Sequence, residues 1–213
     1  MGSLVLVRHS LTDASQSGRN LGQGDDPPLT DAGAALASRL ADALAIEIGE
    51  LPHDELRLIS SPALRCRQTA EPVALRLGIG VVEVADGLIE IDYGAWEGLT
   101  ADECRRRDPE LRARWEADPW TTRCPDGESG ADVAARAFPI LEAIEAWAAE
   151  ARGRCAVVVA HNHVNRLRLC AHMGWPMSTY RDRIASDPAG YSLLTFGRGL
   201  PVVRRLNAAP AQP

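Results

Sequence analysis

Four short apolar runs, separated by longer amphipathic stretches, constrain the fold of this chain more than any other feature. The runs are residues 4–7, 56–60, 81–84 and 156–160. Their nearly continuous hydrophobicity is typical of strands that are buried on both faces, because a half-exposed strand alternates apolar and polar residues. Helices between such strands cover the two faces of a mainly parallel sheet. We therefore predict an α/β fold, a three-layer α/β/α sandwich.

The chain ends with a different pattern. Residues 191–196 and 202–206 form two further apolar runs joined by Gly197 to Pro201, which predicts a hairpin at an edge of the sheet. The predicted helices lie between the runs and begin at residues that can cap them. These caps are Thr30, Ser61 followed by Pro62, Thr100 and Ser129, and a last helix is expected over 164–173, ending at Gly174.

Length and composition favour one domain over residues 1–213, with 208–213 as a loose tail. The chain has 213 residues, 46% of them apolar, which is enough for one large core. Its net charge is −6, and charges of both signs are spread along the sequence without a basic stripe. We therefore do not expect a nucleic-acid partner. A few arginines can still attract a small anion to an acidic protein.

The apolar run at residues 4–7 is too short for a membrane span or a signal peptide, because charged Arg8 follows it at once. The five cysteines include no C-x-x-C pair, so neither a disulfide framework nor a zinc site is predicted. We expect a cytoplasmic protein with reduced thiols and no membrane partner.

Polar residues follow three of the predicted strands. Arg8 and His9 follow the first, a segment leading to Arg65 follows the second, and His161 follows the run at 156–160. The carboxyl ends of parallel strands meet at one edge of a sheet, where such folds bind ligands. Two arginines and two histidines at one place would repel each other unless an anion lay between them. A phosphoryl group is the expected ligand.

The residue types at this edge suit phosphoryl transfer. The planar guanidinium groups of Arg8 and Arg65 can each pair with two phosphate oxygens. The same positive charges favour the neutral form of His9, which a nucleophile must have. They would also stabilise the transferring group in the transition state.

With these segments the chain resembles the histidine phosphatase superfamily, also called phosphoglycerate-mutase-like. The resemblance starts at LVLVRHSLT, where an Arg-His pair follows the first strand, and extends over nearly the whole chain in the family's order. The other segments are GDDPPLTDAG, SSPALRCRQTAEP, EIDYGAWEG, PDGES and VVVAHNHVNR. Six ordered segments make this match specific.

The resemblance implies roles for individual residues. His9 would be the phosphorylated histidine, Arg8 and Arg65 would bind the phosphate, and His161 would donate to its oxygens. Glu90 matches the family's proton donor to the leaving oxygen, and a carboxyl in that role needs a raised pKa. No metal or other cofactor is implied.

Further positions are candidates for the same site. Ser15 and Asn162 are expected to contact phosphate, and Ser10, Tyr93 and His163 to line the substrate pocket. The family usually has glycine at the position of Ser10 and glycine or alanine after the second histidine, where this chain has Asn162 and His163. These differences are expected to shape the substrate site.

The function expected from the resemblance is hydrolysis of a small phosphorylated metabolite. Only about thirty residues, 99–128, follow the EIDYGAWEG segment before the end of PDGE, and Asp92 stands where the mutases usually have histidine. These features favour the phosphatase branch over a cofactor-dependent mutase. Two other hypotheses stay open, a metal site at His161 and His163 and a phosphate-binding module without turnover. The oligomeric state is also open, with a homodimer as one alternative.

Overall fold

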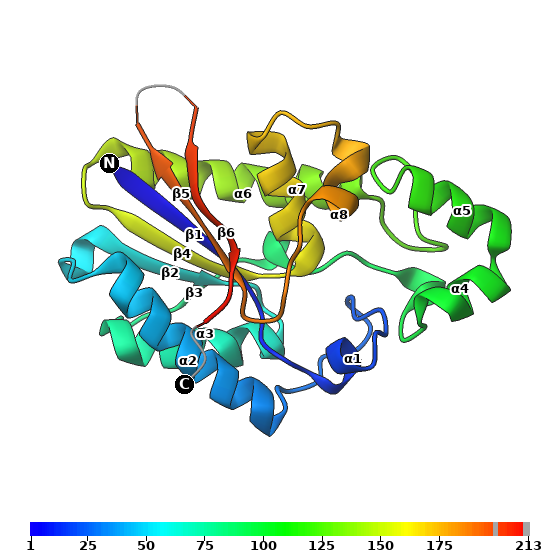
Figure 1. The fold of residues 1–213 in the computed structure, drawn as a ribbon, viewed down its shortest axis with the longest axis horizontal. Coiled ribbons are helices and arrows are strands. Elements are labelled where there is room, and N and C mark those ends of the chain that lie inside the picture. Colours follow the sequence, from blue (N-terminus) through cyan, green and yellow to red (C-terminus); the bar gives the residue numbers. More distant parts are fainter. Residues whose placement is uncertain (198–199, 211–213) are drawn as a thin grey trace.

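A six-stranded sheet forms the centre of the molecule (Figure 1). The computed structural model describes residues 1–197 and 200–210. The strand order is β3-β2-β4-β1-β5-β6; the first four are parallel, whereas β5 and β6 are antiparallel to their neighbours. The strands are β1 (Gly2–Arg8), β2 (Leu56–Ser60), β3 (Glu83–Val84), β4 (Cys155–Ala160), β5 (Tyr191–Phe196) and β6 (Val202–Ala208).

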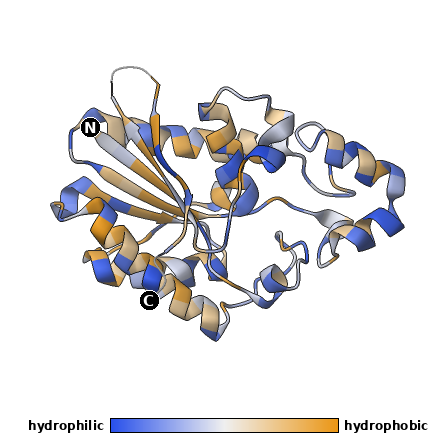
Figure 2. Ribbon diagram, viewed as in Figure 1, coloured by the Kyte–Doolittle hydropathy of each residue, from blue (hydrophilic) through white to orange (hydrophobic). Residues whose placement is uncertain are grey.

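Helices cover both faces of the sheet, as the sequence predicts. Helices α2 (Asp31–Ile48) and α3 (Leu64–Leu77) pack on one face, and α6 (Gly130–Glu150) and α7 (Asn162–His172) pack on the other. Successive residues of β1 point to opposite faces. Val5 therefore belongs to the core between the sheet and helices α2 and α3, and Leu4 to the core between the sheet and helices α6 and α7. Hydrophobic residues accordingly concentrate in the strands (Figure 2). The three-layer α/β/α prediction is confirmed.

Shorter elements connect this framework. Helices α4 and α5 extend away from the sheet at one end of the molecule (Figure 1). The short helices are α1 (Asp13–Gln16), α4 (Ala101–Arg107), α5 (Pro109–Ala117) and α8 (Tyr180–Arg183), and the 3-10 turns are η1 (His53–Glu55), η2 (Asp86–Leu88), η3 (Gly94–Trp96) and η4 (Met177–Thr179). Within the described ranges, no helix combines the length and the apolarity needed to cross a bilayer.

Three of the four predicted caps are confirmed. The hydroxyls of Thr30, Thr100 and Ser129 accept hydrogen bonds from backbone N–H groups in the first turns of α2, α4 and α6. The prediction for Ser61 is wrong, because α3 begins after Ala63 and has no side-chain cap. The Ser61 hydroxyl instead contacts His161.

Some boundaries also differ from the predictions. The run at 81–84 contributes only the two residues of β3. Helix α7 begins at Asn162, two residues earlier than predicted, and ends at His172. Met173 caps it, and Gly174 follows with a φ of +63°, the left-handed conformation expected after a helix. Strand β6 reaches Ala208, which pairs with Tyr191, so this residue is not part of a tail. The predicted hairpin loop and tail fall partly on 198–199 and 211–213, which lie outside the described residues.

Candidate active site

The histidines that follow β1 and β4 lie side by side. Their strands are neighbours in the sheet, and the ring centroids of His9 and His161 are 5.4 Å apart in an edge-to-face arrangement. Both side chains are buried. The carboxyl edge of the sheet therefore brings together the two imidazoles that the sequence places 152 positions apart.

The environment of His9 determines which ring nitrogen can react. Nδ1 lies 2.8 Å from the carbonyl oxygen of Ser10 and so carries the hydrogen that it donates there. This tautomer leaves the lone pair on Nε2. Burial, together with the positive charges of Arg8 and Arg65, lowers the pKa of His9 to about 3. At neutral pH the ring is uncharged, as a nucleophile requires.

His161 is held by hydrogen bonds on both ring nitrogens. Nε2 lies 2.8 Å from Oγ of Ser61, and Nδ1 lies 3.4 Å from Nη2 of Arg65. Arginine can only donate, so Nδ1 is the acceptor and Nε2 carries the hydrogen. Burial lowers the pKa of His161 well below its usual value, and Arg65 acts in the same direction.

Arg65 lies in the first turn of α3, and its side chain is almost completely buried. Its Nη2 donates to the carbonyl oxygen of Gly22 at 2.8 Å, and its Nη1 lies 3.4 Å from a carboxylate oxygen of Asp26. The chain segment before α2 therefore anchors this guanidinium beside His161.

Arg8 is the last residue of β1. Its Nη1 donates to the carbonyl oxygen of Ser186, whereas its buried Nε has no hydrogen-bond partner among the described residues. Burial lowers the pKa of Arg8, the charges of Glu90 and Asp187 oppose this effect, and the charge of Arg65 adds to it. The two arginines are thus close enough to influence each other electrostatically.

Glu90 lies in the segment between η2 and η3, beside the first turn of α7. Its carboxylate accepts hydrogen bonds from the backbone N–H of Ile91 at 2.9 Å and of His163 at 3.3 Å. Burial by itself raises the pKa of this carboxyl, but the His163 side chain and these N–H donors outweigh burial and lower the pKa below its usual range. Burial lowers the pKa of His163, and the neighbouring Glu90 opposes this effect. The raised pKa expected for Glu90 is therefore not produced by the protein groups alone.

Sequence reasoning missed the residues that hold the backbone of Glu90. The guanidinium of Arg136 donates to the carbonyl oxygens of Gly87, Ile89 and Glu90 at 2.6–2.9 Å. Glu128 binds the same guanidinium at 2.8 Å and accepts from the N–H of Asp92 at 2.9 Å. Glu128 lies within the PDGES segment that carries the resemblance, so its place in that segment was the available signal. Arg136 lies on α6, outside the segments that carry the resemblance, so no sequence signal indicated its role.

The remaining predicted site residues differ in where their polar groups point. The Ser10 hydroxyl donates to the carbonyl oxygen of Gly33 at 2.7 Å, and the Ser15 hydroxyl closes the capping box of α1 with Thr12. Asn162 is the first residue of α7, and its Oδ1 is buried without a partner among the described residues. Both serine hydroxyls therefore donate to backbone carbonyl oxygens of the protein itself.

His163 and Tyr93 belong to an aromatic cluster beside Glu90. The His163 ring lies 5.5 Å from Tyr93, 5.7 Å from Tyr180 and 6.3 Å from Trp115 between centroids, and its Nδ1 lies 3.5 Å from a Glu90 oxygen. This cluster closes the Glu90 side of the site.

The geometry required by the metal hypothesis is not observed. That hypothesis placed His161 and His163 on an extended segment, where residues two apart face the same way. Asn162 instead begins a helix, and the two rings have different partners, Ser61 for one and Glu90 for the other. In the described part of the chain, no three His, Cys, Asp or Glu side chains form a cluster suited to a metal.

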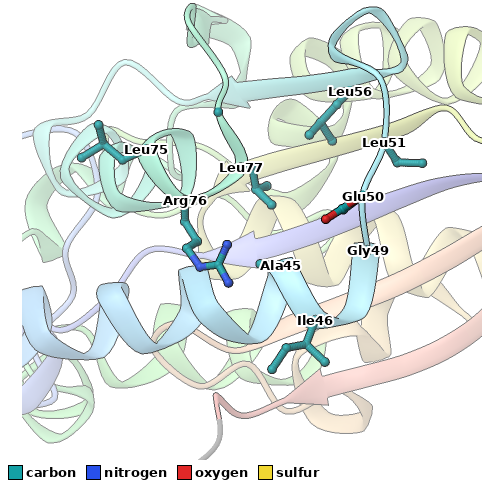
Figure 3. A pocket seen from close by; sticks show the side chains of 10 residues that line it. Ala45, Ile46, Gly49, Glu50, Leu51, Leu56, Leu75, Arg76 and Leu77 are labelled. Carbon is teal, nitrogen blue, oxygen red and sulfur yellow. The ribbon is translucent and has the colours of Figure 1, made fainter.

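A groove of about 620 Å³ lies near the amino end of β2, at the end of the sheet opposite to the histidine pair (Figure 3). Its lining comes from the ends of α2 and α3 and from Leu56, where β2 begins. A groove at the amino ends of the strands is remote from the histidine pair. We assign it no part in the chemistry.

Comparison with known proteins agrees with this geometry. Residues 4–209 match the histidine phosphatase superfamily (branch 1). The chain is 32% identical over 210 residues to phosphoserine phosphatase 1 of Hydrogenobacter thermophilus, covering 97% of this chain and 92% of that protein. It is 35% identical over 198 residues to an acid phosphatase of Mycobacterium tuberculosis, covering 92% and 88%. Among solved structures, a mycobacterial glucosyl-3-phosphoglycerate phosphatase described as a complex with VO3 superposes with a TM-score of 0.82 at 28% identity, over 98% of this chain and 100% of the other.

Proposed function

The chain belongs to the histidine phosphatase superfamily (branch 1), whose members matched here are phosphohydrolases, and we propose that it hydrolyses small phosphate monoesters through a phosphohistidine on His9. One observation carries the proposal. The uncharged His9, with its Nε2 lone pair free, lies beside His161, and the positive charges of Arg8 and Arg65 act on its ring.

In the first step, Nε2 of His9 attacks phosphorus and the bond from phosphorus to the ester oxygen breaks. The leaving alcohol takes a proton from Glu90, so the products are phosphohistidine, the free alcohol and the Glu90 carboxylate. Arg8 and Arg65 stabilise the phosphoryl oxygens as charge develops on them, and the His161 ring, whose Nε2–H is held by Ser61, packs edge-to-face beside His9.

In the second step, water attacks the phosphohistidine and releases inorganic phosphate. Glu90, now a carboxylate, accepts the water proton, which restores both His9 and the acid for the next cycle. The dianionic phosphoryl group raises the pKa of a neighbouring carboxyl through like-charge repulsion. The substrate itself thus opposes the donors that lower the pKa of Glu90 in the free protein.

The substrate is proposed at the level of a small phosphorylated metabolite. The relatives are named for phosphoserine and for glucosyl-3-phosphoglycerate, so these two compounds belong first in a panel of phosphate esters. Phosphate release should be measured with the wild-type protein and with His9→Ala. A metabolite cleaved much faster than p-nitrophenyl phosphate identifies the substrate.

The covalent step has a direct test. Wild-type protein quenched during turnover of a ³²P-labelled ester should carry label that is lost in acid and retained in base, and His9→Ala should carry none. Label that survives acid indicates a serine ester and contradicts the proposal. Glu90→Gln should accumulate label from an aryl ester, because its second step lacks the base.

A further inference from the structure

Two arginines beside the candidate site form no ion pair or hydrogen bond with the residues that the structure describes. Arg166 lies on α7, four residues after Asn162 and therefore on the same face of that helix, and Arg181 lies on α8. The Nε atoms of both are buried without a hydrogen-bond partner, and neither side chain forms an ion pair with a described residue. By contrast, Arg136 and Arg168 are paired with glutamates.

Several contacts place Arg181 near Glu90 and His163. The Tyr180 ring, one residue before Arg181, packs 5.7 Å from His163, which also contacts Glu90. The guanidinium of Arg181 lies over the Trp115 ring, with Cζ 4.3 Å from its centroid. This cation–π contact orients the guanidinium, whose buried Nε–H has no acceptor among the described residues.

Arg166 and Arg181 differ from the other two arginines of the site in lacking a nearby counter-charge of their own. Arg65 is paired with Asp26 and Arg8 is influenced by Glu90 and Asp187, whereas neither Arg166 nor Arg181 forms an ion pair within residues 1–197 and 200–210. Burial and the charges of Arg181 and Arg8 lower the pKa of Arg166, and they outweigh Tyr180 and Glu90, which act in the opposite direction. Retaining such a group at partly buried positions costs folding free energy that an anionic ligand would recover.

We propose that Arg166 and Arg181 bind a second anionic group, a carboxylate or another phosphate, on the alcohol part of the substrate. The inference rests on the proposed phosphatase function and names its substrate class as phosphate monoesters with a further negative charge. Arginine suits either group, because its fork of donors matches carboxylate and phosphate alike.

A matched series of substrates tests the proposal. Propyl phosphate, 3-(phosphonooxy)propanoate and propane-1,3-diyl bisphosphate share one carbon chain and differ only in the far group, and homologues of two to five carbons vary its reach. The measured quantity is the ratio of two kcat/KM values. The first is for an ester whose far group is charged, and the second is for the alkyl phosphate of equal length, whose far group is uncharged. This ratio does not depend on the fraction of folded protein.

The wild-type ratio should exceed ten for at least one chain length. Arg181→Gln and Arg166→Gln should each lower the ratio about tenfold or more, which corresponds to the loss of a charge-assisted hydrogen bond. Arg183→Gln is the matched control, because Arg183 is an exposed arginine on the same helix, with its guanidinium over Trp175 instead. Its ratio should stay within twofold of wild type.

Equal ratios in all four proteins overturn the second anion site and leave the phosphatase proposal intact. Calorimetric titration of His9→Ala, with and without Arg181→Gln, gives a measurement that needs no turnover. Tighter binding of the charged ester, lost on Arg181→Gln, supports the site even where no ester is hydrolysed. Weak binding that is unaffected by Arg181→Gln contradicts it.

Discussion

Oγ of Ser61 lies 2.8 Å from Nε2 of His161, so a residue expected to cap a helix instead orients a ring of the histidine pair. The hydroxyl accepts the Nε2 hydrogen, while Arg65 donates to Nδ1. Together these contacts hold one tautomer and one orientation of the His161 ring.

We expect Ser61→Ala to lower kcat/KM about tenfold, because the Nε2 hydrogen loses its acceptor and the ring its orientation. The ¹⁵N shifts of the His161 ring should move toward a mixture of tautomers, which a merely structural loss would not produce. Ser38→Ala, on the exposed face of α2, is the control. An unchanged tautomer together with unchanged activity would remove Ser61 from the site.

For Glu90, the prediction concerns the leaving group. Glu90→Gln should lower kcat/KM for an alkyl phosphate about 10²- to 10⁴-fold, the usual contribution of a general acid. The loss should be much smaller for p-nitrophenyl phosphate, whose leaving group needs no proton. In parallel pH profiles with alkyl esters, the wild type should decline at high pH and the variant should not. Equal losses for both esters would argue that Glu90 is not the proton donor.

Arg136 is predicted to position Glu90 through the three carbonyl oxygens that it binds. Arg136→Met should lower kcat for alkyl phosphates about tenfold or more with a smaller change in KM. It should also destabilise the protein, because Glu128 is left partly buried without its cation. The matched control is Arg123→Met, since Arg123 pairs with Asp132 at an exposed position nearby. If the two variants behave alike, the carbonyl contacts do not matter for turnover.

Folding stability should depend on pH through His9. Its pKa is about 3 in the folded protein and about 6.5 in the unfolded chain, so between these values the unfolded state binds more protons. The stabilising effect of keeping the ring neutral is therefore complete above pH 6.5 and is lost as pH falls toward 3. The free energy of unfolding should fall with a slope approaching about 1.4 kcal/mol per pH unit from this group. Urea titrations from pH 7 to 4 should show a shallower slope for His9→Asn than for wild type.

Gly94 is predicted to be required by the backbone of the EIDYGAWEG segment. Its φ is +51°, and a Cβ there would lie 2.1 Å from the carbonyl oxygen of Pro125. Gly94→Ala should therefore cost well over the ~1 kcal/mol of left-handed strain alone. Gly98→Ala is the matched control, because φ is +72° and no atom lies within 4 Å of the added Cβ. Thermal unfolding of the two variants should separate the clash from the strain.

The sequence by itself determined the architecture and the position of the histidine pair. Short continuous apolar runs are typical of strands buried on both faces, and parallel strands place their carboxyl ends at one edge. His9 and His161 directly follow two such runs, so their meeting required no knowledge of side-chain packing. Local capping patterns at Thr30, Thr100 and Ser129 were equally readable.

Only the tertiary structure decided how each polar group is used. Ser61 has the local pattern of a cap, but β4 brings His161 within hydrogen-bond distance, and that contact prevails. Arg136 reaches the Glu90 backbone across 46 positions of sequence, and Arg181 reaches Trp115 from another helix. The direction of the Glu90 pKa likewise depends on donors from α7. Such contacts join residues with no regular spacing in the chain, because folding, rather than periodicity, sets the distances between them.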